Sequence, residues 1–251
     1  RDADAVTGLA KAKQLHGKEL SFNNILDLYA AVDIAYAFTA PAAVVVKHNN
    51  PCGVAEDKDL ATAYKNAWSC DKLSAFGGII GLNRVVDKKT AEAIAKSGFM
   101  ECVIAPGFDK EAFELLAQKK NVRLMELAPA DFVKDKYDFK KVPGGLLVQD
   151  MDAKQISGED LKIVTKKKPS KAQITSMLFG WKVVKFVKSN AIVLTKGTKT
   201  VGIGMGQTSR VDSAQLAIRR AGKLAKGSCL ASDAFLPKSD TVTFAAKAGI
   251  A

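Results

Sequence analysis

Long apolar runs are missing from this 251-residue sequence, because none approaches the roughly 18 residues that a membrane-spanning helix needs. The N-terminus has neither a starting methionine nor the apolar core of a secretory signal. These absences favour a cytoplasmic chain, and we expect it to be a piece of a longer one.

Cysteine and histidine are scarce, which limits metal chemistry and cross-linking. The four cysteines share no C-x-x-C or C-x-x-H spacing, a pattern that favours reduced thiols over a disulfide framework or a zinc site. One of the two histidines, His48, lies close to Pro51-Cys52 and raises the question of a zinc deaminase. That chemistry needs H-x-E and P-C-x-x-C, whereas asparagines follow His48 and no second cysteine follows Cys52 at that spacing. The sequence therefore excludes zinc-dependent deamination.

Aromatic residues make up only 7% of the chain, while the net charge is +12. A basic surplus favours polyanion binding. However, the densest basic run, TKKKPSK at residues 165–171, has no aromatic residue among its lysines that could stack on bases. We interpret this run as a solvated loop. The diffuse positive charge also suits small anionic ligands such as nucleotides or folates, and nucleic acid is the less favoured partner.

What the sequence does contain is an alternation of helical and strand patterns. Apolar spacing predicts a helix over residues 20–38, capped by Asn23 or Asn24, and a β-branched run predicts a strand over residues 42–48. Pro51-Cys52-Gly53 is then expected to be the turn into the next helix. Further helices are predicted at 58–71, 88–98, 109–121, 174–188 and 210–225, and further strands at 76–83, 102–107, 122–127, 190–196, 200–206 and 228–235. Such alternation is typical of an α/β fold with parallel strands.

The chain divides at a polar, lysine-rich stretch. We expect a first lobe over residues 1–150, a linker over 151–173 and a second lobe over 174–251. The second lobe repeats the alternation of the first, although no alignable repeat relates them.

The segment AAVVVKHNNPCGVAED, residues 42–57, places Lys47 and His48 at the end of a buried strand. Strand ends are where α/β sheets bind ligands. An imidazole can act as a general base, and an adjacent ammonium can stabilise an oxyanion. The alternative is a surface lysine beside a hydrogen-bonded histidine.

A second candidate is TVGIGMGQTSRVD, residues 200–212, whose glycines would allow close approach to a ligand. Ser209 can cap the following helix, and Arg210 at its start can hold a phosphate or carboxylate. The spacing matches neither G-x-G-x-x-G nor a Walker loop. A tight strand turn without a ligand is the alternative.

Two further segments place polar side chains at strand ends. In VKSNAIVL, residues 187–194, Ser189 and Asn190 precede a strand, and simple strand entry is the alternative to a site. In ASDAFLPKSD, residues 231–240, Asp233 and Phe235 follow a strand. Such groups suit a flat heterocycle, although Phe235 could instead be buried.

Taken together, these segments resemble one family closely. GKELSFNNILD, VVVKHNNPCGVA, SAFGGIIGLNR, GGLLVQD, VKSNAIV, TVGIGMGQTSRVDSA and ASDAFLP occur in this order along the chain. The same motifs characterise the formyltransferase region of the bienzymes that join aminoimidazole carboxamide ribonucleotide (AICAR) transformylase to inosine monophosphate (IMP) cyclohydrolase. The resemblance covers essentially the whole chain.

The resemblance implies formyl transfer from 10-formyltetrahydrofolate to the 5-amino group of AICAR, a step of IMP biosynthesis. By the same resemblance, His48 would help to deprotonate that amine, Lys47 would stabilise the oxyanion and assist the departing folate nitrogen, and Asp240 would be a nearby catalytic carboxylate. Binding residues carried over from the family are Asn190, Arg210 and Phe235 for the nucleotide, and Gly77, Glu101 and Val211 for the folate.

The family's fold is similar to two cytidine-deaminase-like α/β lobes with mixed sheets, here truncated at both ends. The resemblance also implies a homodimer with sites at the interface, and a parent chain that carries an IMP cyclohydrolase domain. It leaves open a requirement for a monovalent cation such as potassium. The sequence departs from the family at Leu236, where phenylalanine is usual, and at Lys238-Ser239.

An alternative function is a catalytically incomplete basic α/β module that binds nucleotide or RNA.

Overall fold

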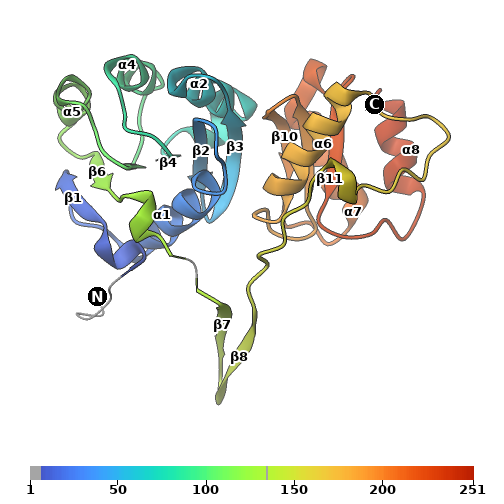
Figure 1. The fold of residues 1–251 in the computed structure, drawn as a ribbon, viewed down its shortest axis with the longest axis horizontal. Coiled ribbons are helices and arrows are strands. Elements are labelled where there is room, and N and C mark those ends of the chain that lie inside the picture. The colour runs from blue at the N-terminus through green and yellow to red at the C-terminus, as the bar shows by residue number, and fades with distance from the viewer. Residues whose placement is uncertain (1–6, 134) are drawn as a thin grey trace.

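The computed structural model describes residues 7–133 and 135–251, so the first six residues of the predicted first lobe lie outside it. Two lobes lie side by side, and a projecting hairpin belongs to the chain segment that runs from one to the other (Figure 1). The α-helices are α1 (Phe22–Ala35), α2 (Leu60–Cys70), α3 (Lys72–Ala75), α4 (Lys88–Lys96), α5 (Lys110–Ala117), α6 (Lys171–Val184), α7 (Arg210–Ala221) and α8 (Asp240–Lys247). Short 3₁₀ helices are η1 (Leu9–Lys11), η2 (Pro129–Asp131), η3 (Gly158–Asp160) and η4 (Gly222–Leu224). The strands are β1 (Lys13–His16), β2 (Ala42–Lys47), β3 (Asn50–Glu56), β4 (Ile79–Leu82), β5 (Cys102–Ala105), β6 (Arg123–Glu126), β7 (Tyr137–Val142), β8 (Gly145–Asp150), β9 (Ile192–Lys196), β10 (Lys199–Gly204) and β11 (Cys229–Ser232).

One sheet of nine strands runs through both lobes, in the order β1-β6-β5-β4-β2-β3-β10-β9-β11. Strands β4, β5 and β6 are parallel, whereas the other neighbours are antiparallel. The predicted α/β class with a mixed sheet is confirmed, but the expectation of parallel strands holds for one part only. The reason is that β2–β3 and β9–β10 are hairpins, and a two-residue connection can join only antiparallel strands.

The lobes meet where β3 lies beside β10. Ala55 pairs with Lys199, and the Thr200 hydroxyl accepts a hydrogen bond from the Val54 N–H (2.9 Å). This junction makes the sheet continuous. The division into lobes at residues 151–173 stays a prediction, although α6 begins at Lys171, inside the predicted linker.

The two lobes repeat one arrangement of elements. In the first, α1 precedes the hairpin β2–β3, then α2, and β4 returns beside β2. In the second, α6 precedes the hairpin β9–β10, then α7, and β11 returns beside β9. Helices α1 and α6 pack on the same face of the sheet, with Leu28 and Phe179 in one apolar core. On the opposite face, α2, α4 and α5 cover the first lobe and α7 covers the second.

Helix starts follow the expected capping chemistry, with one correction. The cap of α1 is Ser21, whose side chain accepts a hydrogen bond from the Asn24 N–H (3.2 Å). The Asn24 side chain in turn accepts from the Ser21 N–H (3.0 Å), which completes a capping box. Asn24 therefore belongs to the cap, but neither it nor Asn23 is the capping residue itself.

The predicted turn at Pro51-Cys52-Gly53 is wrong, because these residues lie inside β3. The register opposite β2 steps from Gly53 to Pro51, so Cys52 is the extra residue of a β-bulge. A bulge can hold a proline, which has no N–H for the ladder. A Cβ at Gly53 would lie 2.0 Å from the Ala67 carbonyl oxygen, so this glycine is required by the packing of α2 on β3.

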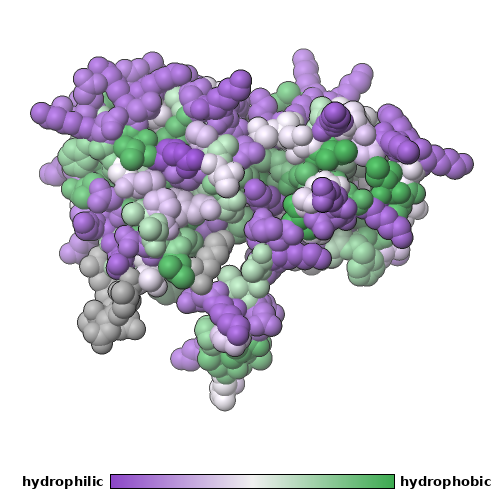
Figure 2. All heavy atoms as spheres, in the orientation of Figure 1, coloured by the Kyte–Doolittle hydropathy of each residue, from purple (hydrophilic) through white to green (hydrophobic). Residues whose placement is uncertain are grey.

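The hairpin β7–β8 projects away from both lobes (Figure 1). Its tip is among the hydrophobic parts of the visible surface (Figure 2), and Phe139, Leu146, Leu147 and Val148 are each at least half exposed. The linker that follows contains η3 and no α-helix before Lys171. Within the described ranges, no helix is long and apolar enough to cross a membrane.

Candidate functional site

Most of the residues predicted to form the site lie at one end of the sheet. The last residue of β2 and the first residues of β3, β4 and β5 lie at this end. In the second lobe, the first residue of β9 and the last residues of β10 and β11 lie there too. Eight of the predicted residues occupy strand ends, turns and helix starts that adjoin these positions: Lys47, His48, Gly77, Glu101, Asn190, Arg210, Val211 and Phe235. The ninth, Asp240, begins α8, eight residues after the end of β11. The structure thus collects two groups, one on each lobe.

The Lys47–His48 pair lies at the β2–β3 hairpin and not, as predicted, at a strand-to-helix turn. β2 ends at Lys47, and the two turn residues, His48 and Asn49, have φ of 54° and 60°. Two such residues are the signature of a type I′ turn. The Asp27 carboxylate of α1 accepts hydrogen bonds from both turn N–H groups, at 3.1 Å for His48 and 2.6 Å for Asn49. Asp27 thus holds the turn in a conformation that non-glycine residues seldom adopt, and no motif or spacing in the sequence indicates this role.

The Lys47 ammonium points to the loop that precedes β4. Its Nζ donates a hydrogen bond to the Phe76 carbonyl oxygen (2.8 Å). The next residue, Gly77, has a φ of +73°, and a Cβ there would lie 4.0 Å from this Nζ and 3.7 Å from the Phe99 ring. A side chain at position 77 would therefore contact both the ammonium and the ring. The structure brings Lys47 and Gly77 together.

Two aromatic rings that sequence reasoning missed lie beside this loop. Phe76 and Phe99 have ring centroids 5.9 Å apart, and they are 55% and 42% exposed. An exposed aromatic pair next to a cation offers a surface on which a planar ring could stack. The predicted strand over residues 76–83 included Phe76, whereas β4 begins at Ile79 and both rings lie in loops, where helical and strand spacing does not apply.

Glu101 lies at the start of β5, where its N–H donates to the Gly78 carbonyl oxygen (3.1 Å). Its carboxylate forms an ion pair with Arg123, whose side chain is 12% exposed. The Arg123 Nε also donates to the Glu19 carbonyl oxygen (3.2 Å). Glu101 is therefore already paired, and it connects the site end of the sheet to the segment before α1.

In the second lobe, Asn190 and Arg210 are in direct contact. An Arg210 Nη donates to the Asn190 Oδ1 (2.8 Å), and the other Nη contacts the Ser232 Oγ (3.0 Å) and forms an ion pair with Asp233. The Asn190 Nδ2 donates to the carbonyl oxygens of Gln207 (3.0 Å) and Thr208 (3.1 Å). The predicted nucleotide residues Asn190 and Arg210 thus form one network.

Asp233 is the anchor of this network. Burial raises the pKa of its carboxyl, but hydrogen bonds from Ser189, the Ala191 N–H and Arg210 outweigh that effect and lower the pKa below its usual value. The carboxylate is therefore the stable form beside Arg210. The sequence showed a polar residue at this strand end, but not that it would pair with Arg210.

The remaining predicted residues are less constrained. Val211 is the second residue of α7, whose cap is Ser209 as predicted, with its Oγ accepting from the Asp212 N–H (3.2 Å). Phe235 is 80% exposed, which rules out the buried alternative. Asp240 begins α8, and its Oδ1 accepts from the Thr241 N–H (2.6 Å).

The glycines of residues 200–206 have a different role from the expected one. A Cβ at Gly204 would lie 1.8 Å from the Ser213 carbonyl oxygen, and one at Gly202 would lie 2.2 Å from that of Ala217. Both glycines let α7 pack closely on β10, instead of admitting a ligand. Gly206, with a φ of +66° and open space around it, forms the turn that leads to Arg210.

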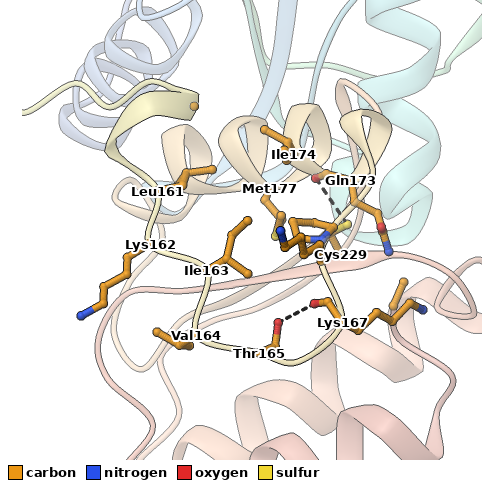
Figure 3. Close-up of a pocket in the computed structure, with 14 residues that line it drawn as sticks. Leu161, Lys162, Ile163, Val164, Thr165, Lys167, Gln173, Ile174, Met177 and Cys229 are labelled. Carbon is orange, nitrogen blue, oxygen red and sulfur yellow. Dashed lines mark hydrogen bonds between the residues drawn. The ribbon is translucent and has the colours of Figure 1, made fainter.

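A separate cavity of about 420 Å³ lies under the linker. Residues 161–168 cover it, and Ile174, Met177 and Cys229 face them from α6 and β11 (Figure 3). None of the nine predicted site residues lines it. Across the described residues, no cluster of three or more His, Cys, Asp or Glu could hold a metal ion.

All four cysteines are free and buried. Cys52, the cysteine closest to the Lys47–His48 turn, lies in the apolar core. Burial, with a smaller effect of Asp71, raises the pKa of its thiol to about 12. The thiol therefore stays protonated near neutral pH, which argues against a nucleophilic role for Cys52.

The fold and the site define a two-lobed α/β protein whose polar side chains converge from both lobes on one end of a shared sheet. Residues 1–220 match the family model described as AICARFT/IMPCHase bienzyme. The chain belongs to this family.

Curated relatives agree with this assignment. The bifunctional purine biosynthesis protein PurH of Oceanobacillus iheyensis is 52% identical over 242 residues, which is 96% of this chain and 47% of that protein. PurH of Bacillus subtilis is 52% identical with the same coverage, and PurH of Staphylococcus carnosus is 51% identical over 100% of this chain and 50% of its own length. The chain thus spans about half the length of the curated relatives it matches.

Proposed function

We propose that the chain catalyses formyl transfer from 10-formyltetrahydrofolate to the 5-amino group of AICAR, in the biosynthesis of IMP. The observation that carries this proposal is the convergence of Lys47–His48 from one lobe and Asn190–Arg210 from the other on the same end of one sheet. Membership of the AICARFT/IMPCHase family supports the choice of reaction.

The proposed reaction needs a base and a fixed cation. The amine nitrogen attacks the formyl carbon, and a tetrahedral oxyanion forms. The C–N bond to the folate nitrogen then breaks, and the proton lost by the amine passes to that nitrogen. His48, exposed in its turn, accepts the amine proton, and Lys47 stabilises the oxyanion. The Phe76 carbonyl oxygen, 2.8 Å from the Lys47 Nζ, orients the ammonium before substrate arrives.

Arg210 is the proposed ligand for the nucleotide phosphate. A guanidinium has five N–H donors, and the contacts to Asn190, Ser232 and Asp233 use three of them. Those contacts fix the plane of the group, so its remaining donors present a defined direction to an anion. Phe235, largely exposed after β11, is the proposed stacking residue for the nucleotide base.

The folate is proposed to bind on the first-lobe side of the site. Gly77 and the exposed rings of Phe76 and Phe99 offer a surface for its bicyclic ring. Glu101 and Val211 would complete the folate pocket, and Asp240 would be the nearby catalytic carboxylate. Potassium or another monovalent cation remains a proposed additional cofactor.

The proposal extends to the assembly. We propose a homodimer, because the exposed apolar side chains of β7–β8 form the kind of surface that a partner usually covers. A cytoplasmic parent chain with an IMP cyclohydrolase domain is also proposed, in keeping with the bifunctional PurH proteins that the chain resembles.

Calorimetric titration with AICAR tests the nucleotide half of this proposal. Arg210→Ala should weaken binding by about tenfold or more, because it removes a charge-assisted contact to the phosphate. His48→Ala should bind AICAR nearly as tightly as the unmodified chain but lose formyl transfer, because His48 acts on the amine only in the reaction.

Two results would contradict the proposal. One is an Arg210→Ala variant that binds AICAR as well as the unmodified chain. The other is strong, salt-dependent binding to a long polyanion with no preference for AICAR, which would favour a basic nucleotide- or RNA-binding module.

A further inference from the structure

The side-chain amide of Asn50 connects the two lobes at the site. Its Nδ2 donates to the His48 carbonyl oxygen (3.0 Å), and its Oδ1 accepts from the Lys188 N–H (2.9 Å). Asn50 is the first residue of β3, whereas Lys188 precedes β9 in the second lobe. One half-buried amide therefore joins main-chain groups of both lobes.

The two partners of Asn50 belong to the two halves of the site. The His48 carbonyl lies in the turn that presents the imidazole. The Lys188 carbonyl accepts from the Gly206 N–H (2.8 Å), so the same peptide segment is tied to the turn that leads to Arg210. Two residues beyond Lys188, Asn190 contacts Arg210 directly. A displacement of Lys188 would therefore move the nucleotide residues relative to His48.

The strand pairing between the lobes lies at the other end of β3. The β3–β10 ladder pairs Ala55 with Lys199, near the last residue of β3. The register of β10 then shifts between Thr200 and Gly202. At the site end of β3, the Asn50 amide connects the two lobes, which the β3–β10 ladder does not do there.

We propose that Asn50 is a positioning residue that sets the distance between the His48 turn and the nucleotide segment of the second lobe. This inference rests on the proposed function for its catalytic consequence, but the link itself can be tested without activity. A misplacement of about 1 Å between reacting groups can cost about 100-fold in rate. Asn50 is thus expected to affect turnover more than nucleotide affinity.

The experiment compares Asn50→Leu and Asn50→Asp with a matched control, Asn66→Leu. Leucine removes both hydrogen bonds at similar size, while aspartate keeps the acceptor for the Lys188 N–H and loses the donor to His48. Asn66 also joins the lobes, because its Oδ1 accepts from the Lys199 Nζ (3.2 Å), but it lies on α2 with no contact to the His48 turn. Comparison of Asn50→Leu with Asn66→Leu therefore distinguishes an effect on the geometry of the site from a general loss of contact between the lobes.

For Asn50→Leu we expect kcat for formyl transfer to fall by about tenfold or more while the Kd for AICAR changes by less than about threefold. Asn50→Asp should lie between Asn50→Leu and the unmodified chain in kcat, because it keeps one of the two bonds. Asn66→Leu should keep kcat, even if its thermal midpoint falls as far as that of Asn50→Leu. Amide hydrogen exchange at Lys188 should become faster in Asn50→Leu and stay unchanged in Asn66→Leu.

The proposal is overturned if Asn50→Leu leaves both Lys188 exchange and the His48 ring resonances unchanged. It is also overturned if Asn66→Leu lowers kcat as much as Asn50→Leu does. Absence of formyl transfer and of AICAR binding in the unmodified chain is a different result, because it contradicts the proposed function. In that case Lys188 exchange and the His48 resonances alone decide whether Asn50 holds the two segments together.

Discussion

The guanidinium of Arg210 contacts Asn190, Ser232 and Asp233 at once, so two other segments of the second lobe converge on one side chain. Arg210 and Asp233 are only 11% and 15% exposed. A pair this far from water contributes little net stability by itself, but loss of one partner leaves the other charge uncompensated. The network therefore fixes the geometry of Arg210, the proposed phosphate ligand, more than it stabilises the fold.

Asp233→Asn should lower the free energy of unfolding by about 2–3 kcal/mol near neutral pH, because Arg210 then lacks its carboxylate partner. The pKa of Asp233 is lowered in the folded chain. Its contribution is therefore present above the unfolded pKa of about 3.9 and is lost as the pH falls through the folded pKa. In urea denaturation, the difference in the free energy of unfolding between Asp233→Asn and the unmodified chain should disappear below about pH 4. Asp150→Asn, on the exposed hairpin, is the control, and a difference independent of pH would contradict the expectation.

At the scale of elements, small residues decide how closely helices approach the sheet. Gly53 allows α2 to lie against β3, and Gly202 and Gly204 allow α7 to lie against β10. In both lobes, the close contact between helix and strand thus depends on glycines in the strand. Because Arg210 and Val211 begin α7, the packing of α7 on β10 also sets where the proposed nucleotide site lies.

Gly204→Ala should lower the free energy of unfolding by about 1–3 kcal/mol, because the added Cβ would lie 1.8 Å from the Ser213 carbonyl oxygen and α7 would have to shift. That shift should also weaken AICAR binding through Arg210. Gly145→Ala is the matched control, since its Cβ would meet only the Val142 side chain at 3.9 Å. Thermal unfolding and calorimetry measure both effects. If Gly204→Ala and Gly145→Ala had the same stability and the same affinity for AICAR, the packing of α7 on β10 would not determine the geometry of the site.

The elements that the sequence predicted well include helices with one apolar face. Helices α2 and α7 lie within the predicted ranges, because their buried positions recur at helical spacing. Strands β5 and β6 also lie within their predicted ranges, and β5 is a short apolar run that is buried on both faces of the sheet. The hairpin β7–β8 was missed, since its residues are almost all exposed and carry no pattern of burial. The turn predicted at residues 51–53 was wrong because proline and glycine there serve a bulge and a helix contact.

The candidate site was predictable only in part. Its members could be placed at strand ends from the pattern and assigned from the resemblance, but their partners could not. Asp27 holds the His48 turn and Asn50 reaches Lys188, and the latter pair is separated by 138 positions. Such contacts depend on the order of strands in the sheet. Hairpins and crossovers determine that order, and the local spacing of residues does not encode it.

At the scale of the molecule, the continuous sheet is supplemented by a buried ion pair between the lobes. The Arg220 Nε of α7 lies 3.2 Å from the Asp71 Oδ2, and the two side chains are 26% and 11% exposed. An Arg220 Nη also donates to the Ile203 carbonyl oxygen (2.9 Å). Asp71 caps α3 through the Ser74 N–H (3.0 Å). α3 leads directly to Phe76, whose carbonyl oxygen accepts from Lys47, so the pair connects the helix of Arg210 to the loop that holds the ammonium.

A double-mutant cycle measures this connection. Asp71→Asn and Arg220→Met should each lower the free energy of unfolding by about 2–4 kcal/mol, and the double variant should lose less than the sum, because the partner is then no longer left as an unpaired buried charge. Lys88 and Glu111 form the control pair, since their atoms are 3.4 Å apart but their side chains are 59% and 65% exposed. Water screens such a pair, so its cycle should show almost no coupling. If the two cycles gave equal coupling, the buried pair would not join the lobes, and Lys47 and Arg210 would be linked through the sheet alone.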